Sequence, residues 1–185
     1  MNAAALRGGV RDVTPLLLGI APFGLVTGIA AVNAGLGIEQ AVGMSILVFA
    51  GAAQLAALEL IRTDTPLLVI VVTAAVINLR MLMYSASIAP HFRTFAGKWK
   101  GALAYVLTDQ AYALSIARFE TEDPVTKRSY YLGVALPIWV VWQTMTVAGV
   151  ILGARVPPAW GLEFTIPLVF LALLVPAVED RETLI

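Results

Sequence analysis

The sequence predicts an all-α fold, a polytopic transmembrane helix bundle of about six hydrophobic spans, some of them broken or re-entrant, on three observations. Hydrophobic residues make up 59% of the 185 residues and charged residues only 13%, whereas a typical soluble domain has about 25% charged residues. Mean hydropathy is +0.86. Charged residues divide the chain into about six apolar runs, and these lack the alternation of barrel strands. We therefore expect a single membrane domain over residues 1–185, embedded in a lipid bilayer.

The composition also argues against several other classes of function. Net charge is zero, so no basic field indicates a nucleic-acid partner. With no cysteine and one histidine, no metal site or cofactor is expected. Motif searches for a Walker A loop, HExxH or GxSxG find no match, so we predict no catalytic residues. A hydrolase site built from Ser85 or Ser87 with His91 and Asp109 is disfavoured, because neither serine lies in a nucleophile-elbow context.

The six runs, which we expect to be membrane spans, cover residues 15–35, 41–58, 67–90, 101–117, 130–154 and 164–178. A helix needs about 20 apolar residues to cross the hydrocarbon core. The first, second, third and fifth runs meet this length. The fourth is borderline, and the sixth is short enough to be tilted, re-entrant or incomplete.

The positions of lysine and arginine predict the orientation, because cytoplasmic loops carry the excess of these residues. With six crossings and a cytoplasmic N-terminus, seven fall inside: Arg7, Arg11, Arg62, Arg118, Lys127, Arg128 and Arg181. Four fall outside: Arg93, Lys98, Lys100 and Arg155. We therefore expect the N-terminus in the cytoplasm, although three of the four outside charges share one loop.

The first run has a face of small residues that includes the GxxxG pair of Gly24 and Gly28. Such faces let helix backbones approach closely in lipid, so packing alone is one interpretation. The other is that Pro22, which lacks an N–H, opens the helix beside Gly24. Transporters place substrate sites at interrupted helices, which makes Pro22 and Gly24 candidates for a transport path.

In the second run, Gln54 is the only strongly polar side chain at depth. A buried amide must find hydrogen-bond partners. One interpretation is a helix–helix hydrogen bond. The alternative is contact with a ligand, with Gly51 allowing close approach.

The third run contains Arg80, with Asn78 two residues earlier. An arginine at mid-depth costs about 2.5–3.5 kcal/mol, and roughly ten apolar neighbours return about 0.3–0.6 kcal/mol each, so insertion is still favourable. A polar stripe continues from this arginine at helical spacing: Arg80, Tyr84, Ser87 and His91. We expect the stripe to face a partner helix or a wet cavity.

Asp109, in the middle of the fourth run, is the natural partner of Arg80. A static salt bridge that joins the two spans is one interpretation. The other is a pair that separates when substrate arrives. Arg80 would then take a carboxylate, and Asp109 an ammonium group or a proton.

Several short motifs follow one another along nearly the whole chain: Ala21-Pro22-Phe23-Gly24, Phe49-Ala50-Gly51-Ala52-Ala53-Gln54, Asn78-Leu79-Arg80, Tyr84-Ser85, Ala89-Pro90 and Leu107-Thr108-Asp109. In this order and spacing they resemble the AzlC family, the large subunit of bacterial branched-chain amino-acid exporters. The resemblance implies a plasma-membrane permease for valine, leucine and isoleucine, with a small hydrophobic AzlD-type partner. Family members usually continue for another helix or two beyond Ile185, so a truncated C-terminus is one expectation.

Together these observations predict a non-enzymatic exporter of branched-chain amino acids. The residues that we expect along the transport path are Pro22, Gly24, Gly51, Gln54, Asn78, Arg80 and Asp109. The alternative is a membrane scaffold that assembles a complex without transporting anything. The scaffold predicts dry, fully paired polar groups and no cavity at Arg80.

Overall fold

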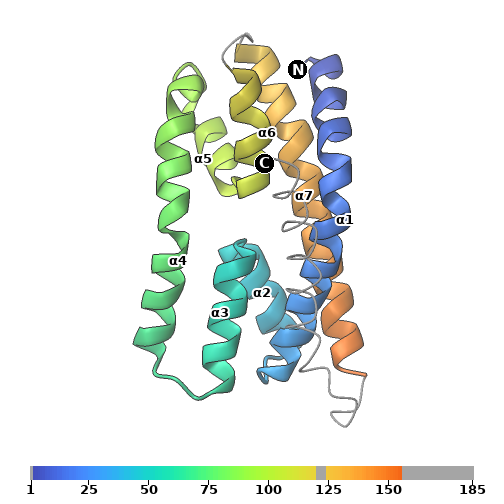
Figure 1. Cartoon of the computed structure of the whole chain (residues 1–185), viewed down its shortest axis with the longest axis vertical. Coiled ribbons are helices and arrows are strands. Elements are labelled where there is room, and N and C mark those ends of the chain that lie inside the picture. Colours follow the sequence, from blue (N-terminus) through green and yellow to red (C-terminus); the bar gives the residue numbers. More distant parts are fainter. Residues whose placement is uncertain (1, 120–123, 156–185) are drawn as a thin grey trace, which may run out of the picture.

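The computed structural model describes residues 2–119 and 124–155, which form seven α-helices and one short 3-10 helix (Figure 1). No strand occurs within these two segments, which confirms the predicted all-α class. The sixth predicted run, residues 164–178, lies outside the described residues.

Three helices are long and apolar enough to cross a membrane. They are α1 (Ala3–Asn33), α4 (Leu67–Ile88) with the short 3-10 helix η1 (Ala89–Phe92) at its end, and α7 (Pro124–Gly153). They correspond to the first, third and fifth predicted runs. In Figure 1, α1 and α7 lie side by side with their N-terminal ends at the same end of the bundle, and α4 runs the opposite way.

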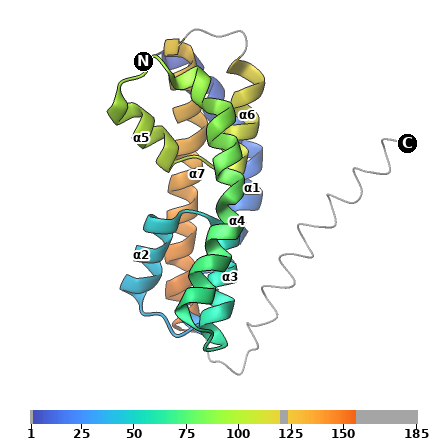
Figure 2. The same cartoon turned by 90° about the vertical axis from the view of Figure 1, so that its left-hand side faces the viewer.

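The other two predicted runs do not cross as single helices. Each divides into two short helices, α2 (Ile38–Val48) with α3 (Gly51–Arg62), and α5 (Gly97–Tyr105) with α6 (Asp109–Phe119). Figures 1 and 2 place α2 and α3 in one half of the bundle and α5 and α6 in the other. An 11-residue helix spans about 16 Å, half of a roughly 30 Å hydrocarbon core. The pairs are therefore re-entrant hairpins that enter from opposite faces.

Backbone conformation and capping explain where each hairpin breaks. Phe49 ends α2 with a left-handed backbone, φ 34° and ψ 49°, and Ala50 is extended before α3 begins. In the second hairpin, the amide of Ala111 donates a hydrogen bond to Thr108 Oγ1 at 3.2 Å. Thr108 thus caps the start of α6, as threonine commonly does at helix N-termini.

The structure shows no opening of α1 at Pro22, so that prediction is wrong. Pro15 and Pro22 both lie inside a continuous helix. Transmembrane helices tolerate proline because packing against neighbouring helices compensates for the freed backbone groups. Here α1 packs along α7, its most extensive partner among the described elements.

Glycines determine how closely α1 and α7 approach. A Cβ at Gly28 would collide with the carbonyl oxygen of Thr146 and would lie 2.7 Å from the amide nitrogen of Val150. At Gly24 the nearest atom would be Met145 Cβ, at 3.1 Å. The GxxxG pair therefore packs α1 against α7, as one of the two predicted interpretations requires.

The hairpins also change which loops share a side. The end of the bundle that carries the N-terminus, hereafter the N-terminal face, also carries the η1–α5 loop and the start of α7 (Figure 1). Arg93, Lys98 and Lys100 therefore lie on the same side as Arg7, whereas Arg62 lies on the other. The prediction from six full crossings placed these loops the opposite way and is wrong, because it counted each hairpin as a crossing.

Candidate functional site at the junction of two half-helix hairpins

The breaks of the two hairpins meet near the middle of the bundle, and an ion pair lies beside them. Arg80 on α4 contacts Asp109, the first residue of α6, with 3.1 Å between Nη1 and Oδ2. The predicted pairing is confirmed. Both side chains remain about one third exposed, at 34% and 37%, so the pair is not sealed within the described part of the chain.

The polar stripe on α4 faces α6 and the start of α7, as predicted. The rings of Tyr84 and Tyr112 stack with centroids 4.5 Å apart. The Tyr112 hydroxyl donates a hydrogen bond to Ser87 Oγ at 2.9 Å. At the end of the stripe, His91 Nδ1 lies 3.5 Å from the ammonium group of Lys127. The stripe therefore forms the polar seam between α4 and the second hairpin.

Four of the predicted path residues carry a buried polar atom without a hydrogen-bond partner in the described segments. These atoms are Gln54 Oε1, Asn78 Oδ1, Arg80 Nε and Asp109 Oδ1. Gln54 is only 1% exposed. None of the described residues donates a helix–helix hydrogen bond to its side-chain carbonyl oxygen. Buried polar groups normally have partners. This set therefore has unused hydrogen-bonding capacity, which a ligand or water can take up.

At the junction, carbonyl oxygens near the helix C-termini accept side-chain hydrogen bonds, whereas the amides at the N-terminus of α3 have no side-chain cap. Three side chains donate hydrogen bonds to carbonyl oxygens near the C-terminal ends of α2 and α5: Gln143 to Ser45 (3.2 Å), Tyr105 to Ile46 (2.7 Å) and Tyr131 to Leu103 (3.0 Å). In contrast, no side chain caps the N-terminus of α3 at Ala50. Helix N-termini carry a partial positive charge and free amides that favour anions. The uncapped α3 and the Arg80 guanidinium thus make the junction suitable for a carboxylate.

Two pockets adjoin the junction. The first, of about 70 Å³, is lined by Gly51, Arg80 and Thr108 together with apolar side chains from α1 and α7. The second, of about 230 Å³, is lined by Asn78 and Tyr105 among others. The pockets share Phe49, Ala50 and Met81. Gly51 and Arg80 therefore line one pocket, Asn78 lines the adjoining one, and Asp109 lies beside them through its contact with Arg80.

Pro22 and Gly24 lie away from the junction, and Gln54 is buried within α3 and lines neither pocket. Pro22 is inside α1, and Gly24 packs against α7. At Gly51, the close approach that glycine permits is made by aromatic rings, since a Cβ would lie 2.6 Å from both the Phe23 and Trp142 rings. Their roles in transport remain predictions.

Sequence reasoning missed the residues that hold the hairpins together. Tyr105, at the end of α5, bonds Ile46 of the other hairpin and accepts a hydrogen bond from Trp139 Nε1 at 3.1 Å. Ser45 Oγ donates a hydrogen bond to Gln143 Oε1 at 2.9 Å and is buried. The sequence does contain a signal for the break before α6. Thr108 is followed by Asp109, and threonine followed by an acidic residue is typical of a helix start.

Comparison with known proteins identifies relatives along almost the whole chain. The sequence profile of the family described as AzlC protein matches residues 15–156. An inner membrane protein of Escherichia coli, YgaZ, is 23% identical over 99% of this chain and 77% of its own length. Uncharacterized membrane proteins of Archaeoglobus fulgidus and Helicobacter pylori are 28% and 26% identical, over 97% and 91% of this chain and 79% and 74% of their own lengths. No solved structure matches the chain significantly.

Proposed function

The chain belongs to the AzlC family of membrane proteins, and from this premise we propose that it exports branched-chain amino acids across the bacterial plasma membrane. The observation that carries the proposal is the Arg80–Asp109 pair beside two half-helix breaks, with unpartnered polar atoms around it. Discontinuous helices that meet near mid-membrane are how many transporters build substrate sites.

In the proposed bound state, the substrate separates the ion pair. Its carboxylate is held by Arg80 and the free amides at the start of α3, and Asp109 takes its ammonium group or a coupling proton. Its aliphatic side chain lies against apolar residues that line the smaller pocket, such as Ile20, Phe23 and Ile138. Both charged ends of an amino acid thus gain a partner of opposite charge, which offsets the cost of leaving water.

The orientation that we propose places the N-terminal face in the cytoplasm. Eight lysines and arginines lie on this face: Arg7, Arg11, Arg93, Lys98, Lys100, Arg118, Lys127 and Arg128. Only Arg62 and Arg155 of the described residues lie on the opposite face. Because positive charge accumulates on the cytoplasmic side, this distribution supports an N-terminus in the cytoplasm.

A small hydrophobic AzlD-type subunit is the proposed partner. The outward face of α4 offers a large apolar surface, formed by exposed residues: Leu67, Leu68, Val69, Val71, Val72, Val76, Leu79, Leu82 and Met83. Lipid or a hydrophobic subunit can cover such a surface. Co-purification of the two subunits, and leucine efflux with and without the partner, test whether transport requires it.

Leucine efflux from cells that carry Arg80→Ala or Asp109→Asn tests the mechanism. We expect both variants to lose at least tenfold in efflux rate at equal protein level, because each leaves one substrate charge without its counterpart. Arg62→Ala is the matched control. It removes an arginine from an exposed ion pair with Glu59, 2.6 Å long, away from the junction. Wild-type efflux from both junction variants would remove the ion pair from the mechanism.

A further inference from the structure

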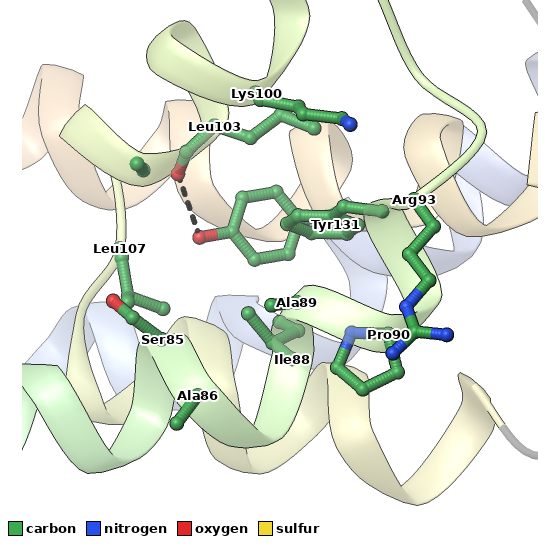
Figure 3. Close-up of a pocket in the computed structure, with 12 residues that line it drawn as sticks. Ser85, Ala86, Ile88, Ala89, Pro90, Arg93, Lys100, Leu103, Leu107 and Tyr131 are labelled. Carbon is green, nitrogen blue, oxygen red and sulfur yellow. Dashed lines mark hydrogen bonds between the residues drawn. The ribbon is translucent and has the colours of Figure 1, made fainter. Parts of the chain in front are cut away.

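A third and larger pocket, about 460 Å³ in volume, extends from Ser85 and Leu107 to Arg93 in the η1–α5 loop at the N-terminal face. Figure 3 shows it between α4, η1, α5 and α7, with Tyr131 across its middle. In Figure 3, Lys100 lies above Tyr131 and Arg93 lies to the right with its guanidinium beside Pro90, whereas Ser85 and Leu107 lie to the left. This volume is in the range of small-molecule sites, about 300–1,000 Å³.

The chemistry of this pocket fits an anion with an apolar body. Its walls are mainly apolar, and its lining includes two cations and no carboxylate. No ion pair joins Arg93 or Lys100 to another described residue. An arginine and a lysine without counter-charge can bind a carboxylate through charge-assisted hydrogen bonds, while the exposed apolar residues Ala86, Ala89 and Pro90 can contact a hydrocarbon chain.

The pocket is continuous with the junction in its lining residues. It shares Ser85, Ala104 and Leu107 with the pocket of about 230 Å³, and that pocket in turn adjoins the Arg80 pocket through Phe49 and Met81. The large pocket therefore adjoins the proposed substrate site through walls that neighbouring pockets share.

We propose that this pocket is a vestibule in which an apolar amino acid docks by its carboxylate on Arg93 and Lys100 before it reaches the hairpin junction. The proposal rests on the proposed function and adds to it a second, earlier site. The vestibule binds the carboxylate and contacts the aliphatic chain, whereas the junction also binds the ammonium group. An apolar acid without an ammonium group therefore binds the vestibule and competes with substrate for it.

The proposal is tested by leucine transport in proteoliposomes of neutral phosphatidylcholine that contain the full chain, together with its partner subunit if efflux requires one. The competitor is 4-methylpentanoate. We expect Arg93→Ala/Lys100→Ala to raise the KM for leucine at least fivefold, with the maximal rate changed less than twofold. The inhibition constant of 4-methylpentanoate should rise by the same factor. Lys98→Ala/Arg7→Ala removes two charges from the same face and should change neither constant. Arg93→Lys/Lys100→Arg, which keeps both charges, should stay near the wild type.

Two results would overturn the vestibule. The first is equal KM values for the double variant and its control. The second is an effect confined to liposomes that contain phosphatidylglycerol, which would assign the cations to an anionic lipid headgroup. If the wild type transports no leucine, the proposed function fails separately. Binding of 4-methylpentanoate to the protein in neutral nanodiscs then decides, since binding lost in the double variant supports the site and no binding to the wild type refutes it.

Discussion

A graded series of glycine-to-alanine variants tests whether the small-residue face of α1 serves packing rather than the transport path. The added methyl group is the same at Gly28, Gly24 and Gly43, but its surroundings differ. At Gly28 it meets backbone atoms of α7, including Val150 N at 2.7 Å, which is 0.7 Å inside the 3.4 Å where ordinary contact begins. At Gly24 it meets Met145 Cβ at 3.1 Å, and at Gly43 nothing lies within 4 Å.

The cost follows from these distances. Backbone atoms cannot rotate away, so Gly28→Ala must push α1 and α7 apart, and a gap of about 0.5–1 Å forfeits a quarter to a half of the contact energy. Overpacking of this kind costs about 1–3 kcal/mol, and we expect Gly28→Ala at the upper end and Gly24→Ala at the lower end. Gly43→Ala lies in α2 and should be neutral or gain about 0.5–1 kcal/mol from helix propensity.

Thermal unfolding of the detergent-solubilised protein measures this order, with leucine transport per folded molecule measured alongside. A loss of about 3 kcal/mol lowers the midpoint by about 6–12 °C in a chain of this size. Transport per folded molecule should stay within twofold of the wild type for Gly24→Ala. If Gly24→Ala instead abolished transport without lowering the midpoint, Gly24 would belong to the path and the packing explanation would be refuted.

Three further predictions concern the hairpins. Tyr105→Phe removes the hydroxyl that forms hydrogen bonds with both Ile46 and Trp139. The loss should cost about 1–2 kcal/mol, at roughly 0.6 kcal/mol or more per bond in lipid. An unchanged thermal midpoint would contradict a stabilising role for these two bonds. Gln143→Leu leaves the buried Ser45 without its amide partner and should cost about 1–3 kcal/mol, whereas an unchanged thermal midpoint would contradict that contact. The chain has no cysteine, so Gly97→Cys and Thr65→Cys can be labelled singly by an impermeant thiol reagent. Gly97→Cys should react only from the cytoplasm and Thr65→Cys only from outside, whereas six full crossings from a cytoplasmic N-terminus predict the reverse.

The sequence was sufficient to predict the Arg80–Asp109 contact, because two opposite charges in apolar helices have few other ways to be neutralised. Helical spacing likewise predicted that Tyr84 and Ser87 face a partner helix, and both contact Tyr112. These predictions depend on burial cost and periodicity, which local sequence carries. The opening at Pro22 failed because tertiary packing along α7 decides whether a proline kinks or interrupts a helix.

The break predicted near Gly51 is confirmed between α2 and α3, but the sequence showed neither its cause nor the second break, between α5 and α6. Neither break contains a proline, and Phe49 adopts a left-handed backbone that only a minority of non-glycine residues populate. A hydropathy profile measures how apolar a segment is, and it does not detect where the chain reverses direction within that segment. Hydrogen bonds from other helices, such as those of Tyr105 and Gln143 to the end of α2, stabilise the break, and they are contacts over long sequence distances.

Charge placement contained the missing information about topology. Six full crossings leave three cations, Arg93, Lys98 and Lys100, in one outside loop, which conflicts with the tendency of positive charge to stay in the cytoplasm. Converting the second run into a hairpin moves that loop to the N-terminal side and leaves Arg62 across from it. Converting the fourth run as well leaves Arg155 on the side of Arg62. The three cations in one outside loop were therefore evidence against six full crossings, and not against a cytoplasmic N-terminus. In the proposed orientation, Arg93 and Lys100 lie on the cytoplasmic side, from which the proposed exporter would collect its substrate.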